Sequence, residues 1–155
     1  MSTRIEHTYM QEALKEAQKA YEKKEVPVGA VIIKDDQIIA RAHNQKEAHF
    51  SSCAHAEILA IQEASKHLQN WRLTECTLYV TLEPCIMCAG AILAARIKKL
   101  YFSTPDPKGG GVCSLYQILS DTRLNHQVPF HKGLLEKESS LLLKKFFKEK
   151  RAGLF

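Results

Sequence analysis

Apolar positions along the chain recur first at helical spacing and then in short extended runs. Over residues 7–23 apolar side chains repeat every three or four positions with charged residues between them, which predicts an amphipathic helix. Val26-Pro27-Val28-Gly29 then ends the helix and begins an extended stretch. Two apolar segments, 28–33 and 38–42, flank the polar sequence Lys34-Asp35-Asp36-Gln37 and predict a β-hairpin.

The rest of the chain alternates between helical and extended patterns. Residues 43–54 are polar and irregular and predict a loop. After it we expect, in order, a helix over 55–69, a strand over 76–82, a helix from Pro84 to Ala95, a strand over 99–102, a loop over 106–111, a short helix over 115–119, a strand over 128–130 and a helix over 134–150. Strands that alternate with helices favour one sheet covered by helices on both faces. We expect Trp71 in the core.

Length and composition are those of one ordinary globular domain. The chain has 155 residues, of which 45% are hydrophobic and 25% charged, so we expect a single domain over 1–155 with its own core. This balance excludes collagen-like, low-complexity and disordered classes. We expect no secretory signal, no membrane-spanning segment and a cytoplasmic location, because the first 20 residues lack an apolar region and no apolar run is long enough to span a bilayer.

Two short motifs carry candidate chemistry, and each is predicted to open a helix. They are His55-Ala56-Glu57 and Pro84-Cys85-Ile86-Met87-Cys88. Cys85 and Cys88 are three positions apart, so on a helix both sulfur atoms can face one ion. Thiolate and imidazole groups are ligands that zinc prefers, and a helix N-terminus stabilises thiolate over thiol. The motifs therefore predict one zinc ion per chain, held by His55, Cys85 and Cys88.

The number of ligands bears on whether this zinc is catalytic. A structural zinc site is normally closed by four protein ligands, whereas a catalytic site keeps a position for water. His55, Cys85 and Cys88 make three, which favours catalysis. Cys53 is the alternative fourth ligand, and a site closed by it would be structural.

Glu57 is the candidate proton carrier. It follows the histidine ligand by two positions, so its carboxylate can lie beside a zinc-activated water, accept a proton and return it to a leaving amine. The alternative is an acid that stabilises the start of a helix, which contributes at most about 1 kcal/mol. The combination of H-x-E with P-C-x-x-C favours the catalytic role, because it is the signature of zinc-dependent nucleobase deaminases.

The chain resembles the bacterial tRNA-specific adenosine deaminases over nearly its whole length. The residues that carry the resemblance are Glu25-Val26-Pro27-Val28-Gly29-Ala30, Asn44, His55-Ala56-Glu57, Trp71-Arg72-Leu73, the run from Thr77 to Ala91, Asp106-Pro107-Lys108-Gly109-Gly110 and Phe146-Phe147. The block from Leu82 to Ala91 is specific for deaminases that act on nucleic acids. The 106–110 loop and the aromatic, basic C-terminal segment favour the tRNA-acting members.

This resemblance implies a fold, an activity and a set of substrate contacts. The fold is a three-layer α/β/α sandwich of the cytidine-deaminase type with a central mixed five-stranded sheet, and the protein is a homodimer. The reaction is hydrolytic deamination of adenosine to inosine at the wobble position of a tRNA anticodon. By position, Asn44 would hold the target ribose or base edge, Val26 and Val28 would form pocket walls, Asp106 and Lys108 would contact the anticodon backbone, and Phe147 would contact flanking nucleotides.

Several of these assignments have structural alternatives. Asn44 could instead order a loop, and Val26, Val28, Phe146 and Phe147 could be core residues. For Glu83 we favour an acid at a helix start. The chain also departs from the family pattern Asp-Pro-Thr-Ala-His, which here is Ser51-Ser52-Cys53-Ala54-His55, so the geometry of the loop before the histidine is open.

Charge bears on the choice of substrate. The net charge is +5, and five basic residues lie in the C-terminal segment: Lys144, Lys145, Lys148, Lys150 and Arg151. Cations beside aromatic side chains suit single-stranded RNA, although such a run is also common on a solvated helix face. Three other functions stay open: a zinc deaminase of a free base or nucleoside such as guanine or cytosine, a deaminase of DNA or mRNA, and a non-catalytic zinc-stabilised RNA-binding protein.

Overall fold

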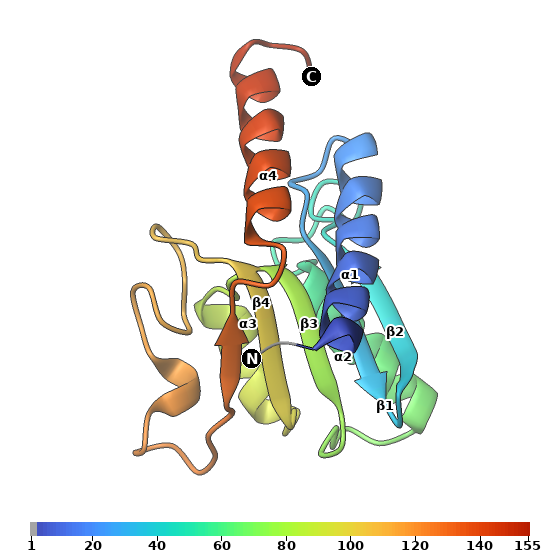
Figure 1. The fold of residues 1–155 in the computed structure, drawn as a ribbon, viewed down its shortest axis with the longest axis vertical. Helices are drawn as coiled ribbons and strands as arrows, with labels where there is room; N and C mark the ends of the chain where they lie inside the picture. Colours follow the sequence, from blue (N-terminus) through green and yellow to red (C-terminus); the bar gives the residue numbers. More distant parts are fainter. Residues whose placement is uncertain (1–2) are drawn as a thin grey trace.

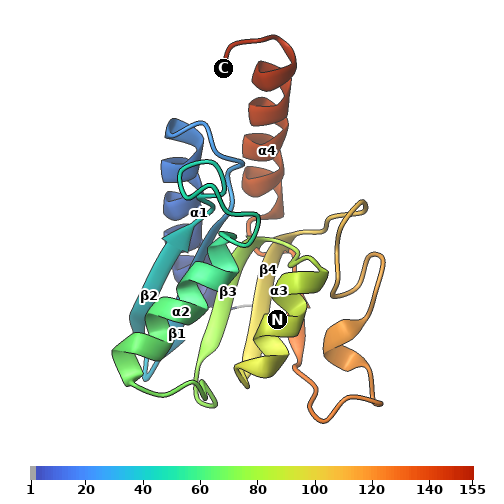
Figure 2. The same ribbon diagram turned by 180° about the vertical axis from the view of Figure 1, so that it is seen from behind.

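A central sheet lies between two layers of helices in the computed structural model, which describes residues 3–155. Helices α1 (Arg4–Glu22) and α4 (Glu136–Arg151) lie on one side of the sheet (Figure 1). Helices α2 (Ala56–Leu68) and α3 (Ile86–Ala94) cover the other side (Figure 2). The three-layer α/β/α sandwich with a five-stranded sheet is therefore confirmed.

The sheet is mixed and has the strand order β2-β1-β3-β4-β5. Strands β1 (Gly29–Lys34) and β2 (Gln37–His43) form the predicted hairpin, and β1 also pairs antiparallel with β3 (Thr77–Leu82). Strands β3, β4 (Lys99–Thr104) and β5 (Phe130–Lys132) run parallel. Parallel strands need crossover connections. Helix α3 makes the crossover between β3 and β4.

Alternation along the strands divides the core between the two helical layers. On β1, Ala30 and Ile32 belong to the cluster that packs with α2 and α3, whereas Val31 and Ile33 belong to the cluster with Tyr9 and Met10 of α1. Helix α1 lies very close to the start of β1, because a Cβ atom at Gly29 would lie 2.0 Å from the carbonyl oxygen of Ala13. This close packing fixes the position of the segment before β1.

Most expected elements occur within a few residues of the predicted bounds, and three expectations differ from the structure. Trp71 was expected in the core, and this is wrong: its side chain is 54% exposed and stacks under the Arg72 guanidinium, 4.4 Å from the ring centre. The short helix expected over 115–119 is a single turn of 3₁₀-helix, Ile118–Ser120. Helix α1 begins earlier than the predicted residue 7, because Thr3 caps its N-terminus. The Thr3 hydroxyl accepts from the Glu6 N–H, and the Glu6 carboxylate accepts from the Thr3 N–H.

Helix α4 extends well beyond the end of the sheet, beside the last turns of α1 (Figure 1). Phe146 is buried at its inner side and contacts Tyr21 of α1, and Phe155 turns back onto Phe146 with ring centres 5.0 Å apart. Phe147 is 40% exposed. The alternative that both phenylalanines are core residues therefore holds for Phe146 alone. Across residues 3–155, the helices are all too short or too polar to cross a membrane.

Candidate active site

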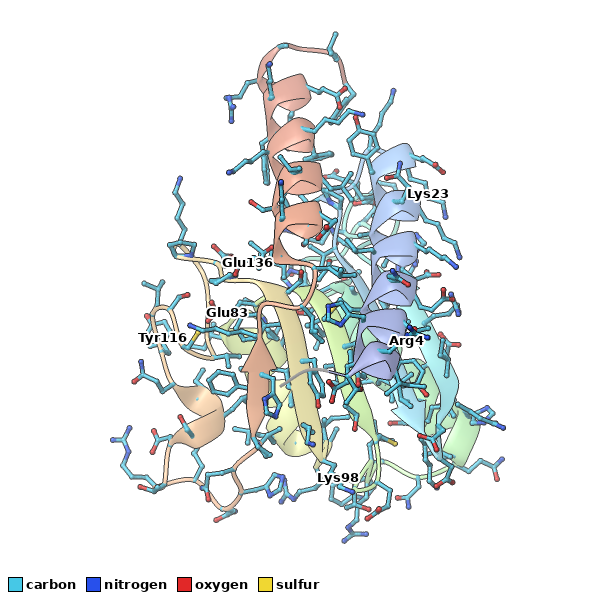
Figure 3. The ribbon with its side chains drawn as sticks, in the orientation of Figure 1. Arg4, Lys23, Glu83, Lys98, Tyr116 and Glu136 are labelled. Carbon is cyan, nitrogen blue, oxygen red and sulfur yellow. The ribbon has the colours of Figure 1, made fainter. Side chains whose placement is uncertain are left out.

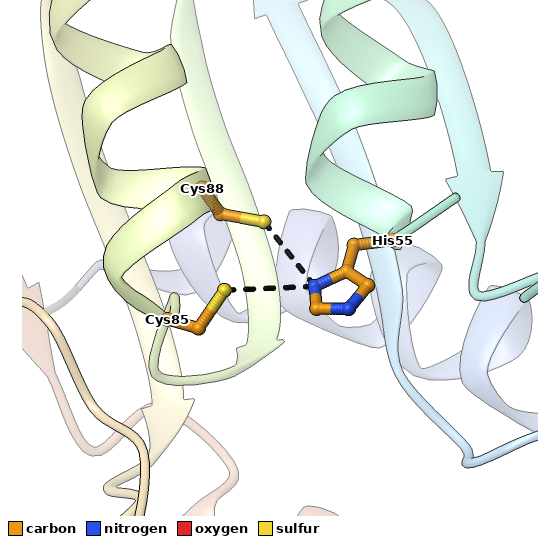
Figure 4. Close-up of side chains that lie close together, drawn as sticks. All are labelled: His55, Cys85 and Cys88. Atoms are coloured by element: carbon orange, nitrogen blue, oxygen red, sulfur yellow. Dashed lines mark hydrogen bonds between the residues drawn. The ribbon is translucent and has the colours of Figure 1, made fainter. Parts of the chain in front are cut away.

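Two helix N-termini bring the candidate metal ligands together. His55 is the N-terminal cap residue of α2, and Cys85 is that of α3. Cys88 lies one turn further along α3 and is fully buried. Both sulfur atoms point toward the imidazole ring of His55 (Figure 4). The expectation that each motif opens a helix is confirmed.

The spacing of the donor atoms fits a tetrahedral zinc ion. The Nδ1 atom of His55 lies 3.6 Å from the sulfur of Cys85 and 3.4 Å from the sulfur of Cys88, and all three donor atoms lie within 4.8 Å of one another. Zinc–sulfur and zinc–nitrogen bonds of the usual length, at tetrahedral angles, place sulfur and nitrogen about 3.5 Å apart. The donor set and its spacing therefore fit zinc, with Nδ1 as the ligand atom of His55.

The protonation of these groups differs from one ligand to the next. The pKa of Cys85 is lowered to about 3, chiefly by a hydrogen bond from the Cys88 thiol and to a smaller extent by one from His55. The pKa of Cys88 is raised, first by its bond to Cys85 and then by burial. The pKa of His55 is raised chiefly by its hydrogen bond to Cys85. A thiolate is thus already favoured at Cys85, whereas Cys88 and His55 would release protons when a metal binds, because the metal takes thiolate and neutral imidazole.

Glu57 lies in the first turn of α2, in the pocket that also contains His55 and Cys85. Its side chain is 4% exposed, and burial raises the pKa of its carboxyl to about 7 against the opposing effects of a backbone hydrogen bond and His55. An acid whose only role is to stabilise a helix start has no need of such burial, which costs the carboxylate its hydration. The burial of Glu57 therefore fits the proton carrier better than the capping acid.

Cys53 does not join the ligand cluster. Its side chain is exposed and its sulfur lies 3.8 Å from the Ser52 hydroxyl. Over the part of the chain that the structure describes, the histidine, cysteine and carboxylate side chains that gather at metal-binding distance here are His55, Cys85 and Cys88. A site with three protein ligands leaves a coordination position for water, as catalysis requires.

Four of the residues proposed to bind substrate line the same cavity, which has a volume of about 160 Å³. They are Val26, Val28, Asn44 and Asp106. The Asn44 amide donates to the Val26 carbonyl at 3.2 Å and accepts from the Lys46 N–H at 3.2 Å. Asn44 thus orders the loop, as its alternative proposed, and it also faces the pocket. Val28 is buried in the core as well as lining the cavity.

The other two proposed substrate contacts, Lys108 and Phe147, line a neighbouring and larger hollow of about 670 Å³. Val26, Leu82 and Asp106 line both hollows, so the two adjoin. Of the basic residues in the C-terminal segment, Lys144 and Arg151 line the larger hollow. Lys145 instead lies over the Tyr21 ring, 5.1 Å from its centre. The basic segment therefore divides between two faces of α4.

Sequence reasoning missed two buried carboxylates that hold the loops around the cavity. Glu25 accepts hydrogen bonds from the backbone N–H groups of Glu47 at 3.0 Å and Ala48 at 2.8 Å. Glu83 accepts from the loop that follows β4, and the expectation of an acid at a helix start is wrong for it. Burial opposes ionisation of Glu83, but these bonds lower its pKa to about 2. An acidic residue beside an apolar strand was the available signal.

Known proteins share both the sequence and the fold. The family model of the MafB19-like deaminase matches residues 5–151. The chain is 51% identical to the tRNA-specific adenosine deaminase of Streptococcus pyogenes serotype M1 over 147 residues, which are 94% of this chain and 86% of that protein.

Two solved structures of different activity are also similar. One, from a study of A-to-I editing by tRNA:A34 deaminases at the wobble position of transfer RNA, has a TM-score of 0.85 and 45% identity over 88% of this chain and 99% of the other. The guanine deaminase of Bacillus subtilis has a TM-score of 0.61 and 38% identity over 63% of each chain.

The extent of the match separates these relatives. Similarity to the Bacillus subtilis guanine deaminase covers 63% of each chain, whereas similarity to the Streptococcus pyogenes tRNA-specific adenosine deaminase covers 94% of this chain. The sandwich is accordingly of the cytidine-deaminase type, as expected. With half of its residues identical over nearly the full length of a curated member, this chain belongs to the family of tRNA-specific adenosine deaminases.

Proposed function

We propose that this chain is a zinc-dependent hydrolase that converts adenosine to inosine at the wobble position of a tRNA anticodon. One observation carries the chemistry: the buried carboxyl of Glu57 shares a small cavity with His55 and Cys85, whose donor spacing fits zinc. A non-catalytic zinc protein would have no use for a buried acid in that position. The sequence similarity supports the choice of substrate.

The chain's own residues would bind the base and move the protons. When bound to His55, Cys85 and Cys88, zinc would lower the pKa of a water molecule toward neutrality and so supply a nucleophile at neutral pH. Glu57 would accept a proton from the attacking water and deliver it to N1 of adenine as C6 is attacked. It would then accept the proton of the new hydroxyl group on C6 and deliver it to the departing amine. Adenosine and water thus give inosine and ammonia, without a redox cofactor.

The walls of the cavity would position the target base. Val26 and Val28 would contact the faces of the base. Asn44 still has one amide hydrogen and one lone pair available after its bonds to Val26 and Lys46, and these would hold the ribose or the base edge. A base in an anticodon loop is already unpaired, so turning it into the cavity costs little.

The larger hollow would hold the nucleotides next to the target. Lys108, Lys144 and Arg151 provide cations for phosphates, and Phe147 provides a ring for stacking, with Asp106 between the two hollows. Stacking of a base on an aromatic side chain contributes about 1–3 kcal/mol. This rim distinguishes an RNA substrate from a free base, because the zinc chemistry would be the same for both.

The experiment compares substrates with the zinc-loaded chain. Ammonia release is measured with an anticodon stem-loop that has adenosine at the wobble position, and with free adenosine, guanine and cytidine. We expect the stem-loop to be turned over with the highest kcat/KM. Faster turnover of guanine or cytidine would contradict the tRNA assignment, while zinc deaminase chemistry would stand.

We also propose that the protein acts as a cytoplasmic homodimer, with one deaminase domain per chain. Ile86, Leu115 and Tyr116 are each at least half exposed and line one hollow beside α3, which a second copy would cover. Light scattering at micromolar concentration should give the mass of a dimer, and Leu115→Asp should shift it toward the monomer. A fully active monomer would contradict this.

A further inference from the structure

Glu83 is the first residue after β3, two residues before Cys85, and it is 2% exposed. Its carboxylate accepts five hydrogen bonds from the segment that follows β4. Oε1 accepts from the Asp106 N–H at 3.0 Å and the Ser114 hydroxyl at 2.5 Å. Oε2 accepts from the N–H groups of Val112 at 3.1 Å, Cys113 at 2.9 Å and Ser114 at 3.0 Å. Glu83 and Tyr116, just beyond this segment, lie on the same side of the molecule (Figure 3).

Two glycines let the segment close around this carboxylate. A Cβ atom at Gly110 would lie 2.2 Å from Oε2 of Glu83, and one at Gly111 would lie 2.9 Å from the backbone nitrogen of Ile86 in α3. The Gly111 N–H also donates to the Pro84 carbonyl at 2.8 Å. The loop over 105–114 is therefore folded onto Glu83 and onto the start of the ligand-bearing helix.

This arrangement leaves Glu83 no capacity to act on substrate directly. A carboxylate offers about four lone-pair sites, and five donors already converge on this one. Glu83 differs in this from Glu57, whose carboxyl is buried beside the metal ligands.

The loop that Glu83 holds leads to a proposed substrate contact. Asp106, whose N–H Glu83 binds, accepts the Lys108 N–H on its own Oδ1 at 3.1 Å. Lys108 itself is exposed, so its side chain is free to reach a phosphate. A short chain of hydrogen bonds thus runs from the buried carboxylate to the backbone of Lys108.

We propose that Glu83 is a positioning residue, which fixes the 105–114 loop so that Lys108 stands beside the catalytic cavity and binds a phosphate of the substrate. The identity of the substrate in this proposal rests on the proposed function. The ordering of the loop rests on the hydrogen bonds to Glu83 alone. Glu83→Gln tests it, because the amide would bring an N–H₂ group against converging N–H donors and leave some of them unpaired.

The first measurement needs no substrate. Hydrogen–deuterium exchange of the amides over 106–114 is compared in the unaltered chain, Glu83→Gln and Glu25→Gln, all loaded with zinc. Glu25 is the matched control, because it is also a buried carboxylate that binds loop N–H groups, but those of Glu47 and Ala48. We expect faster exchange over 106–114 in Glu83→Gln alone. Equal protection in Glu83→Gln and the unaltered chain would overturn the proposal.

The second measurement is a double-mutant cycle on stem-loop affinity. Lys108→Ala should weaken binding by about fivefold in the unaltered chain and in Glu25→Gln, but by less than about twofold in Glu83→Gln, because the lysine there is no longer positioned. A role limited to general stability would leave the Lys108→Ala factor the same in all three backgrounds. That equality would overturn the proposal, as would an absence of any Lys108→Ala effect in the unaltered chain.

Zinc content separates the loop from the metal helix. Glu83→Gln should retain one zinc per chain, and loss of zinc would overturn the proposal by placing the role of Glu83 at Cys85. Failure of the proposed function would look different: the unaltered chain would not deaminate a stem-loop at all, while the exchange difference over 106–114 would remain.

Discussion

The floor and the rim of the pocket are built in different ways. The floor comprises His55, Glu57, Cys85 and Cys88, which all lie at the first turns of α2 and α3. The rim comprises the loops 44–54 and 105–114 and the face of α4 with Lys144, Phe147 and Arg151. Helices packed on the sheet fix the floor, whereas hydrogen bonds to Glu25 and Glu83 fix the two loops of the rim.

This difference separates the chemistry from the choice of substrate. Floor residues are placed by regular structure, so they keep their geometry without substrate. The two loops of the rim are each placed by one buried carboxylate, and the α4 residues of the rim lie away from the metal ligands, so substitutions in the rim can change affinity while the metal site stays intact. Changes in the floor should therefore abolish turnover of every substrate, and changes in the rim should affect binding of RNA first.

The largest effect should come from a ligand. Cys88→Ala removes a buried sulfur that lies 3.4 Å from Nδ1 of His55, so zinc should be lost and turnover should fall to background. Metal analysis and ammonia release would measure this. Cys53→Ser is the matched control and should retain one zinc and full activity, because Cys53 is exposed and outside the cluster. Full zinc occupancy in an active Cys88→Ala variant would disprove the ligand set.

Glu57→Gln should separate metal binding from turnover within the floor. The amide cannot carry protons, so kcat should fall by about 10²–10⁴-fold while zinc content and stem-loop affinity stay unchanged. Single-turnover kinetics, metal analysis and a binding titration measure the three quantities. Loss of zinc together with activity would instead give Glu57 a structural role.

Removing basic residues from one face of α4 at a time should show which face belongs to the rim. Lys144→Ala with Arg151→Ala removes two cations that line the larger hollow. Stem-loop binding should weaken, and the slope of log K against log salt should flatten by about 0.7 for each lost phosphate contact. These substitutions are preferable to deleting residues 148–155, because Phe155 packs on Phe146.

The control for this experiment removes the same charge from other positions on α4. Lys145→Ala with Lys150→Ala should leave the salt slope unchanged, since neither residue lines the hollow. If both double variants lose equal affinity, the C-terminal segment acts only through its net charge. If neither changes affinity or slope, it is a solvated helix end.

The smallest effect on function should come from Glu25. Glu25→Gln leaves a loop N–H group without its carboxylate acceptor, so the free energy of unfolding should fall by about 1–3 kcal/mol. Stem-loop affinity should fall a few-fold, with zinc retained. Thermal unfolding, metal analysis and binding measure this. A variant that binds RNA normally would show that the 44–54 loop does not contribute to the rim.

The sequence predicted where the floor residues lie, at the starts of two helices, because the determinants of those positions are local. The spacing of Cys85 and Cys88, and the helix starts at His55 and Pro84, are set by a few neighbouring residues. The hairpin and the alternation of strands and helices were likewise predicted from the periodic patterns of apolar residues. What the sequence left open was which residues hold the loops around the two motifs.

The rim was harder to predict because its determinants are distant in sequence. Glu83 binds residues more than twenty positions away, and nothing at Val112 or Ser114 indicates an acidic partner. Trp71 was misplaced because an aromatic residue between two elements gives no periodicity that separates core from surface. The division of the basic segment between two faces of α4 likewise required the position of α1 beside it.

Mapping of inosine within the substrate tests the central claim most directly. A tRNA anticodon stem-loop with adenosine at the wobble position and at a second position in the loop is incubated with the zinc-loaded chain, and each position is read by sequencing. We predict inosine at the wobble position alone, and none with Glu57→Gln. Inosine at both positions, or at neither while free adenosine or guanine is deaminated, would contradict the account.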